Sequence, residues 1–166
     1  QPPFLRKLKN NDTFYKFAAH IHGIWHQLGR RCSADVKENP EKHSLLYTPN
    51  PIVVPGGRFR ESYYWDTYWI VKGLLVSNML DTAKGVVENL LYFVDRFGKV
   101  PNGGRVYYLT RSQPPLLSEM VRVVYDALQA NETPPASRNA KSTKSIDFLK
   151  YAIPLLDKEY NFWKEN

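Results

Sequence analysis

Hydrophobic residues recur three or four positions apart along several stretches of the chain, a spacing typical of amphipathic helices. The first such helix is expected to begin at Asn11 or Asp12 and the second at Asp81, because these side chains can cap a helix N-terminus. Gly98 should end the second helix. Pro154 lies inside the last one and should kink or divide it. The four predicted helices span residues 12–28, 81–97, 115–130 and 146–163.

Another stretch, from Asp66 to Met79, is apolar on nearly every side. A helix without a polar face has to be buried all round, so we expect this one in the interior of the fold. The amphipathic helix that follows would then lie outside it. Such pairs of inner and outer helices build toroids, although the periodicity alone equally allows a helix bundle. The predicted fold class is all-α.

Three longer segments show no sustained hydrophobic period, at about 30–64, 98–114 and 131–145. They contain clustered prolines, glycines or polar residues, so we predict loops. Long irregular segments in compact domains are more often functional than idle. We therefore look there for residues that carry chemistry.

Composition and charge exclude several classes of function. With 43% hydrophobic and 23% charged residues, the chain is typical of a globular domain. Its net charge of +7 is spread along the sequence, so no nucleic-acid partner is expected. Cys32 is the single cysteine, which leaves no disulfide framework or thiolate metal cluster. His22 and His26 have a zinc-ligand spacing but no evident third ligand, so neither a metal nor another cofactor is predicted.

The most informative residues run from Pro55 to Trp69 and read PGGRFRESYYWDTYW. A glycine turn here delivers an arginine, several aromatic rings and two carboxylates to the start of the apolar helix. Sugar sites combine these groups, since rings stack on pyranose C–H faces while Arg and Asp bond to neighbouring hydroxyls. A tight turn before a core helix, with the aromatic residues as packing, explains the same residues equally well.

This run resembles the first signature of the trehalases (glycoside hydrolase family 37), P-G-G-R-F-x-E-x-Y-x-W-D-x-Y. Every fixed position of that pattern is present at residues 55–68. A second block is also similar to the family, with P-N-G-G-R at residues 101–105 and R-S-Q-P-P at residues 111–115. The resemblance implies the (α/α)6 toroid of inner and outer helices. Residues 1–166 would then be an incomplete single catalytic domain, holding the first αα-hairpins of the toroid.

The resemblance also implies which residues contact a sugar. Arginines can fork onto neighbouring hydroxyls, a tryptophan offers a stacking face, and amides and carboxylates supply directed hydrogen bonds. The glycines of both blocks would be structural. The implied substrate-binding residues are Arg58, Trp65, Asp66, Asn102, Arg111 and Gln113.

Trehalases split the disaccharide trehalose into two glucose molecules with inversion of configuration, so trehalose is the implied small-molecule partner. Inversion needs a carboxylic acid and a carboxylate base on opposite faces of the sugar. In the family the acid is an Asp in a G-W-D context and the base is a Glu further on, and the G-W-D context does not occur here. We therefore expect both catalysts beyond Asn166. Asp66 is interpreted as a sugar ligand, and Glu61 as a structural partner of a nearby arginine.

A catalytically inactive sugar-binding module of the same fold is the alternative hypothesis. The chain is most similar to extracellular or membrane-anchored family members, which we take as the expected location. Two N-x-T triplets, at Asn11 and Asn131, would be glycan acceptors in a secretory pathway. A cytoplasmic location and the oligomeric state are left open.

Overall fold

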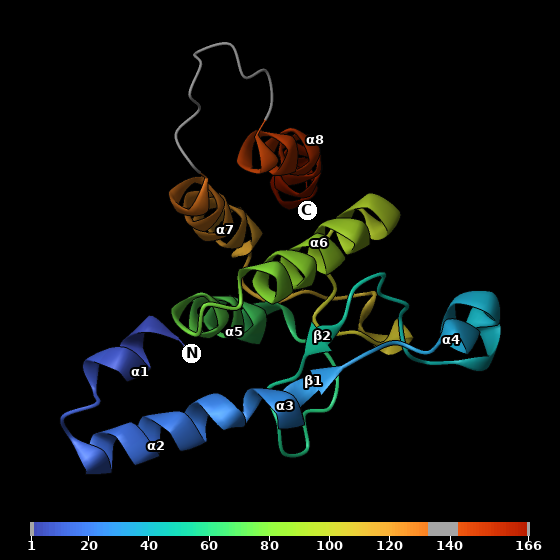
Figure 1. Cartoon of the computed structure of the whole chain (residues 1–166). Helices are drawn as coiled ribbons and strands as arrows, with labels where there is room; N and C mark the ends of the chain where they lie inside the picture. The colour runs from blue at the N-terminus through green and yellow to red at the C-terminus, as the bar shows by residue number, and fades with distance from the viewer. Residues whose placement is uncertain (1, 133–142, 166) are drawn as a thin grey trace.

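The computed structural model describes residues 2–132 and 143–165. Helices account for most of this part of the chain, and two short strands form one antiparallel pair (Figure 1). In chain order the elements are α1 (Pro3–Lys7), α2 (Asp12–Gly23), α3 (Trp25–Leu28), β1 (Gly29–Arg30), α4 (Ala34–Glu38), η1 (Pro40–Lys42), β2 (Ile52–Val53), α5 (Tyr64–Val76), α6 (Leu80–Phe97), η2 (Val106–Tyr108), α7 (Leu117–Asn131) and α8 (Lys144–Glu165).

Helices α5 to α8 make the core. Both α5 and α8 pack against α6 and α7, and in Figure 1 α6 lies between α5 and α8. The apolar stripes predicted for residues 81–97 and 115–130 face this interior, which explains why polar residues remain on the outer sides of α6 and α7. In the described part of the chain, the apolar residues with no exposed surface are Val71, Leu74, Ala83, Val87, Leu91, Val94, Leu117, Met120, Val124 and Ala152.

The helix ends follow the sequence signals in part. Asn11 caps α2, since its side-chain oxygen accepts from the N–H of Phe14 at 3.1 Å. Gly98 ends α6 with a φ of 79°, a left-handed conformation that favours glycine. The expectation that Asp81 caps α6 is wrong. Met79 occupies the cap position, and Asp81 lies in the first turn, where its charge still favours the helix dipole.

Two predicted helices have different shapes from those expected. The helix predicted over residues 12–28 is interrupted at Ile24 and continues as the separate short helix α3. Pro154, conversely, does not divide the last helix, because α8 runs through it without interruption. A proline removes one backbone hydrogen bond from a helix, and the buried side chains of Phe148 and Ala152 keep this part of α8 packed on the core.

The segment predicted as a loop over residues 30–64 contains regular structure. Strand β1 pairs with β2 so that Gly29 lies opposite Val53 and Arg30 lies opposite Ile52, and α4 and η1 lie between the strands in sequence. Each of these elements is too short to show a hydrophobic period, which is why the pattern missed them. Of the loop predicted over residues 131–145, positions 133–142 lie outside the described residues.

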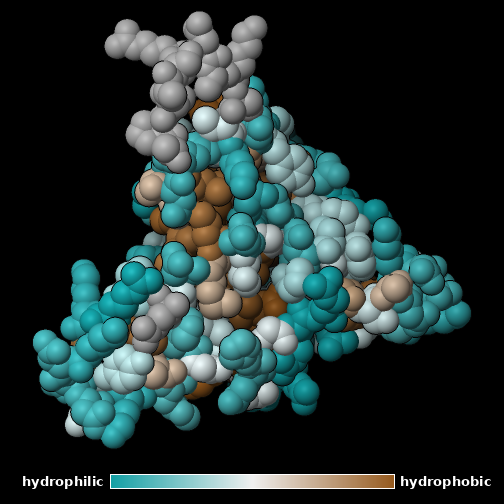
Figure 2. All heavy atoms as spheres, viewed as in Figure 1, coloured by the Kyte–Doolittle hydropathy of each residue, from teal (hydrophilic) through white to brown (hydrophobic). Residues whose placement is uncertain are grey.

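Helix α5 is covered on one side of its surface and open on another. Val71 and Leu74 have no exposed surface, whereas Trp69 is 54% exposed and Val76 is 64% exposed. The expectation of burial all round is therefore not met within this chain. Helix α2 has no buried residue at all, and apolar atoms reach the surface at several places across the face shown in Figure 2.

Candidate functional site

The two sequence blocks lie side by side because their backbones pair. The N–H of Gly104 donates to the carbonyl of Ser62 at 2.9 Å, and the N–H of Tyr64 donates to the carbonyl of Asn102 at 3.2 Å. A Cβ added to Gly103 would lie 3.1 Å from the Ser62 carbonyl oxygen, so this close approach requires glycine. The pairing brings the second block to the first turn of α5.

A tight turn at the start of the first block presents Arg58. Gly56 and Gly57 have φ values of 108° and 58°, which a residue with a side chain rarely adopts. Two hydrogen bonds close the turn, from the N–H of Phe59 to the carbonyl of Gly56 at 3.0 Å and in the reverse direction at 3.3 Å. Arg58 is exposed at the tip of this turn. Its guanidinium carbon lies 4.8 Å from the centre of the Phe59 ring.

Three rings, which we call the aromatic row, join Arg58 to Arg111. The centres of Phe59 and Tyr63 are 5.5 Å apart, and those of Tyr63 and Tyr108 are 5.9 Å apart, both in edge-to-face contact. The guanidinium carbon of Arg111 lies 5.1 Å from the centre of the Tyr108 ring. The two arginines thus stand at opposite ends of one row, each supported by a ring face.

Glu61 belongs to the framework beneath the aromatic row. The Tyr63 hydroxyl donates to Glu61 Oε1 at 3.1 Å, and Arg105 Nε lies 3.8 Å from the same oxygen. Burial raises the pKa of Tyr63 above its ordinary value, and the hydrogen bonds to Tyr108 and Glu61 raise it further, so the phenol stays protonated as a donor. Glu61 is therefore held by Tyr63 and Arg105, which agrees with its interpretation as the structural partner of an arginine.

Gln113 has a role that the sequence did not indicate. Its side-chain Oε1 accepts from the backbone N–H of Trp65 at 2.9 Å, so it caps the N-terminus of α5 from 48 residues further along the chain. The N–H of Asn102 donates to the carbonyl of Arg111 at 2.9 Å and holds the loop that carries Gln113. With its oxygen engaged, Gln113 has its amide nitrogen left to donate to a ligand.

The remaining polar side chains at this end of α5 have no partner in the described part of the chain. Within residues 2–132 and 143–165, no side-chain hydrogen bond or ion pair engages Arg58, Asp66, Asn102 or Arg111. Trp65 is 40% exposed and stands beside them at the start of the helix. All six residues implied by the resemblance therefore lie on or next to the paired blocks, with exposed or partly exposed side chains.

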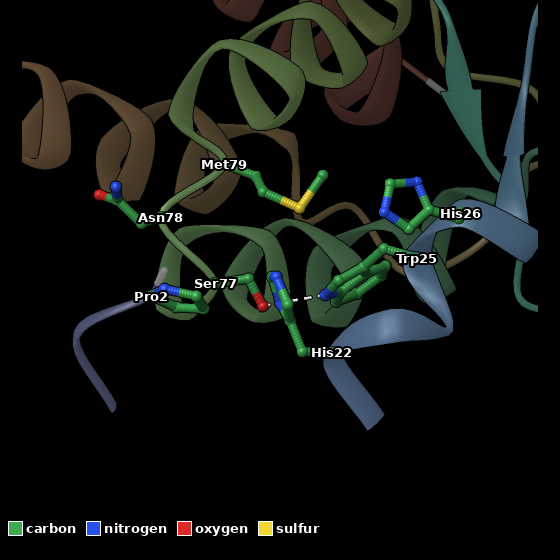
Figure 3. A pocket seen from close by; sticks show the side chains of 7 residues that line it. All are labelled: Pro2, His22, Trp25, His26, Ser77, Asn78 and Met79. Carbon is green, nitrogen blue, oxygen red and sulfur yellow. Dashed lines mark hydrogen bonds between the residues drawn. The ribbon is translucent and has the colours of Figure 1, made fainter. Parts of the chain in front are cut away.

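The six candidate residues form an open surface, and a partly open cavity lies instead at the C-terminal end of α5. A cavity of about 340 Å³ lies between the end of α2, helix α3 and the α5–α6 connection, where Trp25 Nε1 donates to Ser77 Oγ at 2.9 Å (Figure 3). His22 and His26 line it, but no group of three His, Cys, Asp or Glu side chains that could hold a metal occurs in the described part of the chain. None of the six candidate residues lines this cavity.

The whole chain, residues 1–166, matches the family model of the trehalases. It belongs to the trehalase family. It is 45% identical to the trehalase of Apis mellifera over 100% of its length and 42% identical to that of Homo sapiens over 99%, covering 24% and 26% of those proteins. The chain thus spans about a quarter of the length of the curated relatives it matches.

A solved structure supports the fold. The neutral trehalase of Saccharomyces cerevisiae superimposes with a TM-score of 0.56 and 42% sequence identity, over 67% of this chain and 18% of that one. The family and the all-α fold class predicted from the sequence, as part of a toroid, are thereby confirmed. Within the residues that the structure describes, no helix combines the length and the apolar character needed to cross a bilayer.

Proposed function

We propose that the protein carrying this chain hydrolyses trehalose to two glucose molecules, and that this part of it binds the sugar. The observation that carries the proposal is the pairing of the two sequence blocks. It places an exposed indole, two ring-supported arginines and unpartnered Asp and Asn side chains around the N-terminal end of α5. Relatives that align over nearly all of the chain are named trehalases, which supports the choice of substrate.

Each group has a task that suits its geometry. The free guanidinium forks of Arg58 and Arg111 can bond to pairs of neighbouring hydroxyls, while the rings behind them restrict their motion. Trp65 offers a stacking face, and Asp66 accepts hydrogen bonds at the start of the helix. Gln113 donates through its amide nitrogen. Preorganised donors and acceptors of this kind bind a polyol without the entropic cost of ordering long side chains.

The acid and the base of an inverting reaction lie in the rest of the protein. Inversion places two carboxyls about 6.5–9.5 Å apart, with a water molecule between the base and the sugar. Glu61 is 8% exposed and held by Tyr63 and Arg105, so it is not available to a substrate. Asp66 alone does not make a pair. This chain supplies binding groups, and the transition state requires catalysts from elsewhere.

Replacing Arg58 tests the binding site. In the intact protein we expect Arg58→Lys to lower kcat/KM for trehalose by about 30-fold, equivalent to ~2 kcal/mol, because an ammonium cannot make the forked contact. Arg96→Lys is the matched control, since Arg96 is also exposed and stacked on a ring, that of Tyr92, at 5.7 Å. Equal kcat/KM in both variants would remove Arg58 from the site.

The stereochemistry of the product tests the reaction. Inversion of α,α-linked glucose releases one α and one β anomer in the first turnovers, whereas retention releases two α anomers. Proton NMR of the anomeric region, recorded before mutarotation is complete, separates the two outcomes. Sugar binding by the intact protein without any release of glucose would instead establish the inactive binding module.

A further inference from the structure

A second cavity, of about 160 Å³, lies against the paired blocks. Four of the residues that line it are arginines, Arg30, Arg31, Arg60 and Arg105. None of its lining residues, all of which lie in the described part of the chain, is acidic. A small concave space surrounded by guanidinium groups concentrates positive potential and attracts anions.

The cavity borders the first block, but no residue of the aromatic row lines it. Phe59, Glu61 and Tyr63 are joined on one side by the ring contact and the Tyr63–Glu61 hydrogen bond. Arg60 and Ser62, the residues between them, line the cavity. The arginine cavity is therefore separate from the six candidate sugar ligands.

The four arginines divide into two that are fixed and two that are free. Arg30 Nη1 donates to the carbonyls of Gln27 and Gly29, both at 2.7 Å, and Arg105 Nη1 donates to Ser44 Oγ at 3.0 Å. Arg105 Nε is buried and makes no hydrogen bond.

Arg31 and Arg60, in contrast, are exposed, and neither pairs with any group among residues 2–132 and 143–165. Even with Glu61 near Arg105, the cavity keeps an excess of positive charge.

Two hydroxyl groups complete the lining. They belong to Thr48, which is 6% exposed, and Ser62, which is 7% exposed, and both residues line the cavity. Neither hydroxyl forms a hydrogen bond with a described residue, and neither oxygen is fully buried, so both are accessible to a ligand. Unpaired hydroxyls beside guanidinium groups are suited to the oxygens of an anionic ligand, which accept from both.

We propose that this cavity is a binding site for a tetrahedral oxyanion, either free phosphate or the phosphate group of a larger ligand. A volume of about 160 Å³ equals that of roughly five water molecules at ~30 Å³ each, enough for one such anion. Arg31 and Arg60 clamp the anion at the surface, and the two hydroxyls bind it from within. This proposal does not depend on the sugar site or on hydrolysis.

Cys32 provides the measurement, because it also lines the cavity. Alkylation by iodoacetamide, a neutral reagent, is followed in the intact protein by mass spectrometry of the tryptic peptide that carries Cys32. This peptide spans residues 32–37 in the parent and residues 31–37 where Arg31 is replaced. We expect 10 mM inorganic phosphate to slow alkylation at least ~5-fold relative to sodium chloride of equal ionic strength, as a site with a Kd near 2 mM would. Glycerol phosphate is run in parallel. Stronger protection by the ester indicates a phosphorylated ligand, and stronger protection by phosphate indicates the free anion.

A double variant decides whether the arginines are responsible. Arg31→Gln with Arg60→Gln should reduce the protection to less than ~2-fold, and both positions are exposed, so the fold should tolerate the change. The control pair Arg6→Gln with Arg96→Gln removes the same charge away from the cavity and should keep full protection. Equal slowing by phosphate and chloride, or protection that survives in the double variant, would overturn the proposal.

Discussion

Gln113 combines two hydrogen-bonding capacities in a single side chain. Its oxygen accepts the N–H of Trp65 at 2.9 Å, and its nitrogen, which has no partner among residues 2–132 and 143–165, is left to donate to the sugar in the proposed site. Amides combine these two capacities, whereas a carboxylate of the same length only accepts and a leucine does neither. Substitution can therefore separate capping from binding.

Two variants of Gln113 should behave differently in the intact protein. We expect Gln113→Glu to keep the melting temperature, since a carboxylate also accepts at a helix N-terminus, while kcat/KM for trehalose falls by about 10-fold. Gln113→Leu should lose the cap as well, at a cost of about 1 kcal/mol of stability. Differential scanning fluorimetry and a glucose-release assay measure the two effects. A Glu variant with full activity would limit Gln113 to its structural role.

The sequence names the candidate sugar ligands, but it does not indicate the contacts that hold them in place within the chain. The signature run was enough to select Arg58 and Trp65, because the spacing of fixed positions is long and specific. It did not indicate the cap by Gln113 or the ring contact of Tyr63 with Tyr108. These contacts join residues 48 and 45 positions apart, and they follow from the backbone pairing of two loops that have no periodic pattern.

Among the helices, a buried polar network ties α5, α7 and α8 together. The N–H of Leu117 donates to the Tyr64 hydroxyl at 3.0 Å, and that hydroxyl donates to Glu159 Oε2, also at 3.0 Å. The N–H of Val100 donates to the other oxygen of Glu159 at 3.3 Å. Glu159 is only 4% exposed, and burial raises its pKa above the ordinary value, although the hydrogen bonds oppose the rise.

This network predicts how stability depends on pH. A carboxyl whose folded pKa is raised contributes stability that is complete below its unfolded pKa and is lost as the pH rises through the folded value. Glu159→Gln imitates the protonated form. We therefore compare the melting temperature of the intact variant with that of the parent at two pH values. The difference, variant minus parent, should be about 2 °C more positive at pH 8 than at about pH 5.

The matched control for Glu159 is another carboxyl on the same protein. Hydrogen bonds from Arg122 lower the pKa of Glu119, so its contribution is present above its unfolded pKa and is lost only in acid. The effect of Glu119→Gln should thus be the same at both pH values. Equal behaviour of the two variants would show that Glu159 carries no buried charge at neutral pH.

The helices were predictable where a regular hydrophobic spacing continues over several turns. α6 and α7 lie where their stripes indicated, because several turns of buried side chains outweigh any single residue. The signals that failed were local ones. Pro154 has no visible effect on the continuity of α8, whereas Gly23, which the hydrophobic stripe outweighed in the prediction, stands directly before the break at Ile24. A single proline or glycine thus does not decide by itself whether a helix continues, because the packing around it also contributes.

In the whole molecule, two helices present apolar faces that nothing in the described chain covers. On α5 these residues are Trp69 and Val76, and on α2 they are Phe14, Phe17 and Ile21. Contiguous apolar surface of this kind normally lies in an interface. Because the chain spans about a quarter of its relatives' length, we expect the rest of the protein to cover both faces.

Dye binding tests that expectation. The isolated 166-residue chain should bind ANS strongly and self-associate, whereas the intact protein should do neither. In the isolated chain, Trp69→Gln with Val76→Gln should lower the ANS signal more than Val106→Gln, a control on η2 that is 44% exposed. A monomeric chain with a sharp cooperative melt and no dye binding would contradict the prediction.

The isolated chain should also fail to hydrolyse trehalose. Without an acid and a base, the rate of hydrolysis is lower by a factor of at least ~10⁴. The two carboxylates of the first block do not form a free pair that could take these roles. Glu61 is held by Tyr63 and Arg105, and Asp66 is partly buried with no carboxyl partner among the described residues. A coupled glucose assay, with the intact protein as reference, should therefore detect less than about one ten-thousandth of the intact rate. If the chain is active instead, and both Glu61→Gln and Asp66→Asn abolish that activity, these two residues are the catalytic pair and the sugar ligands must be reassigned.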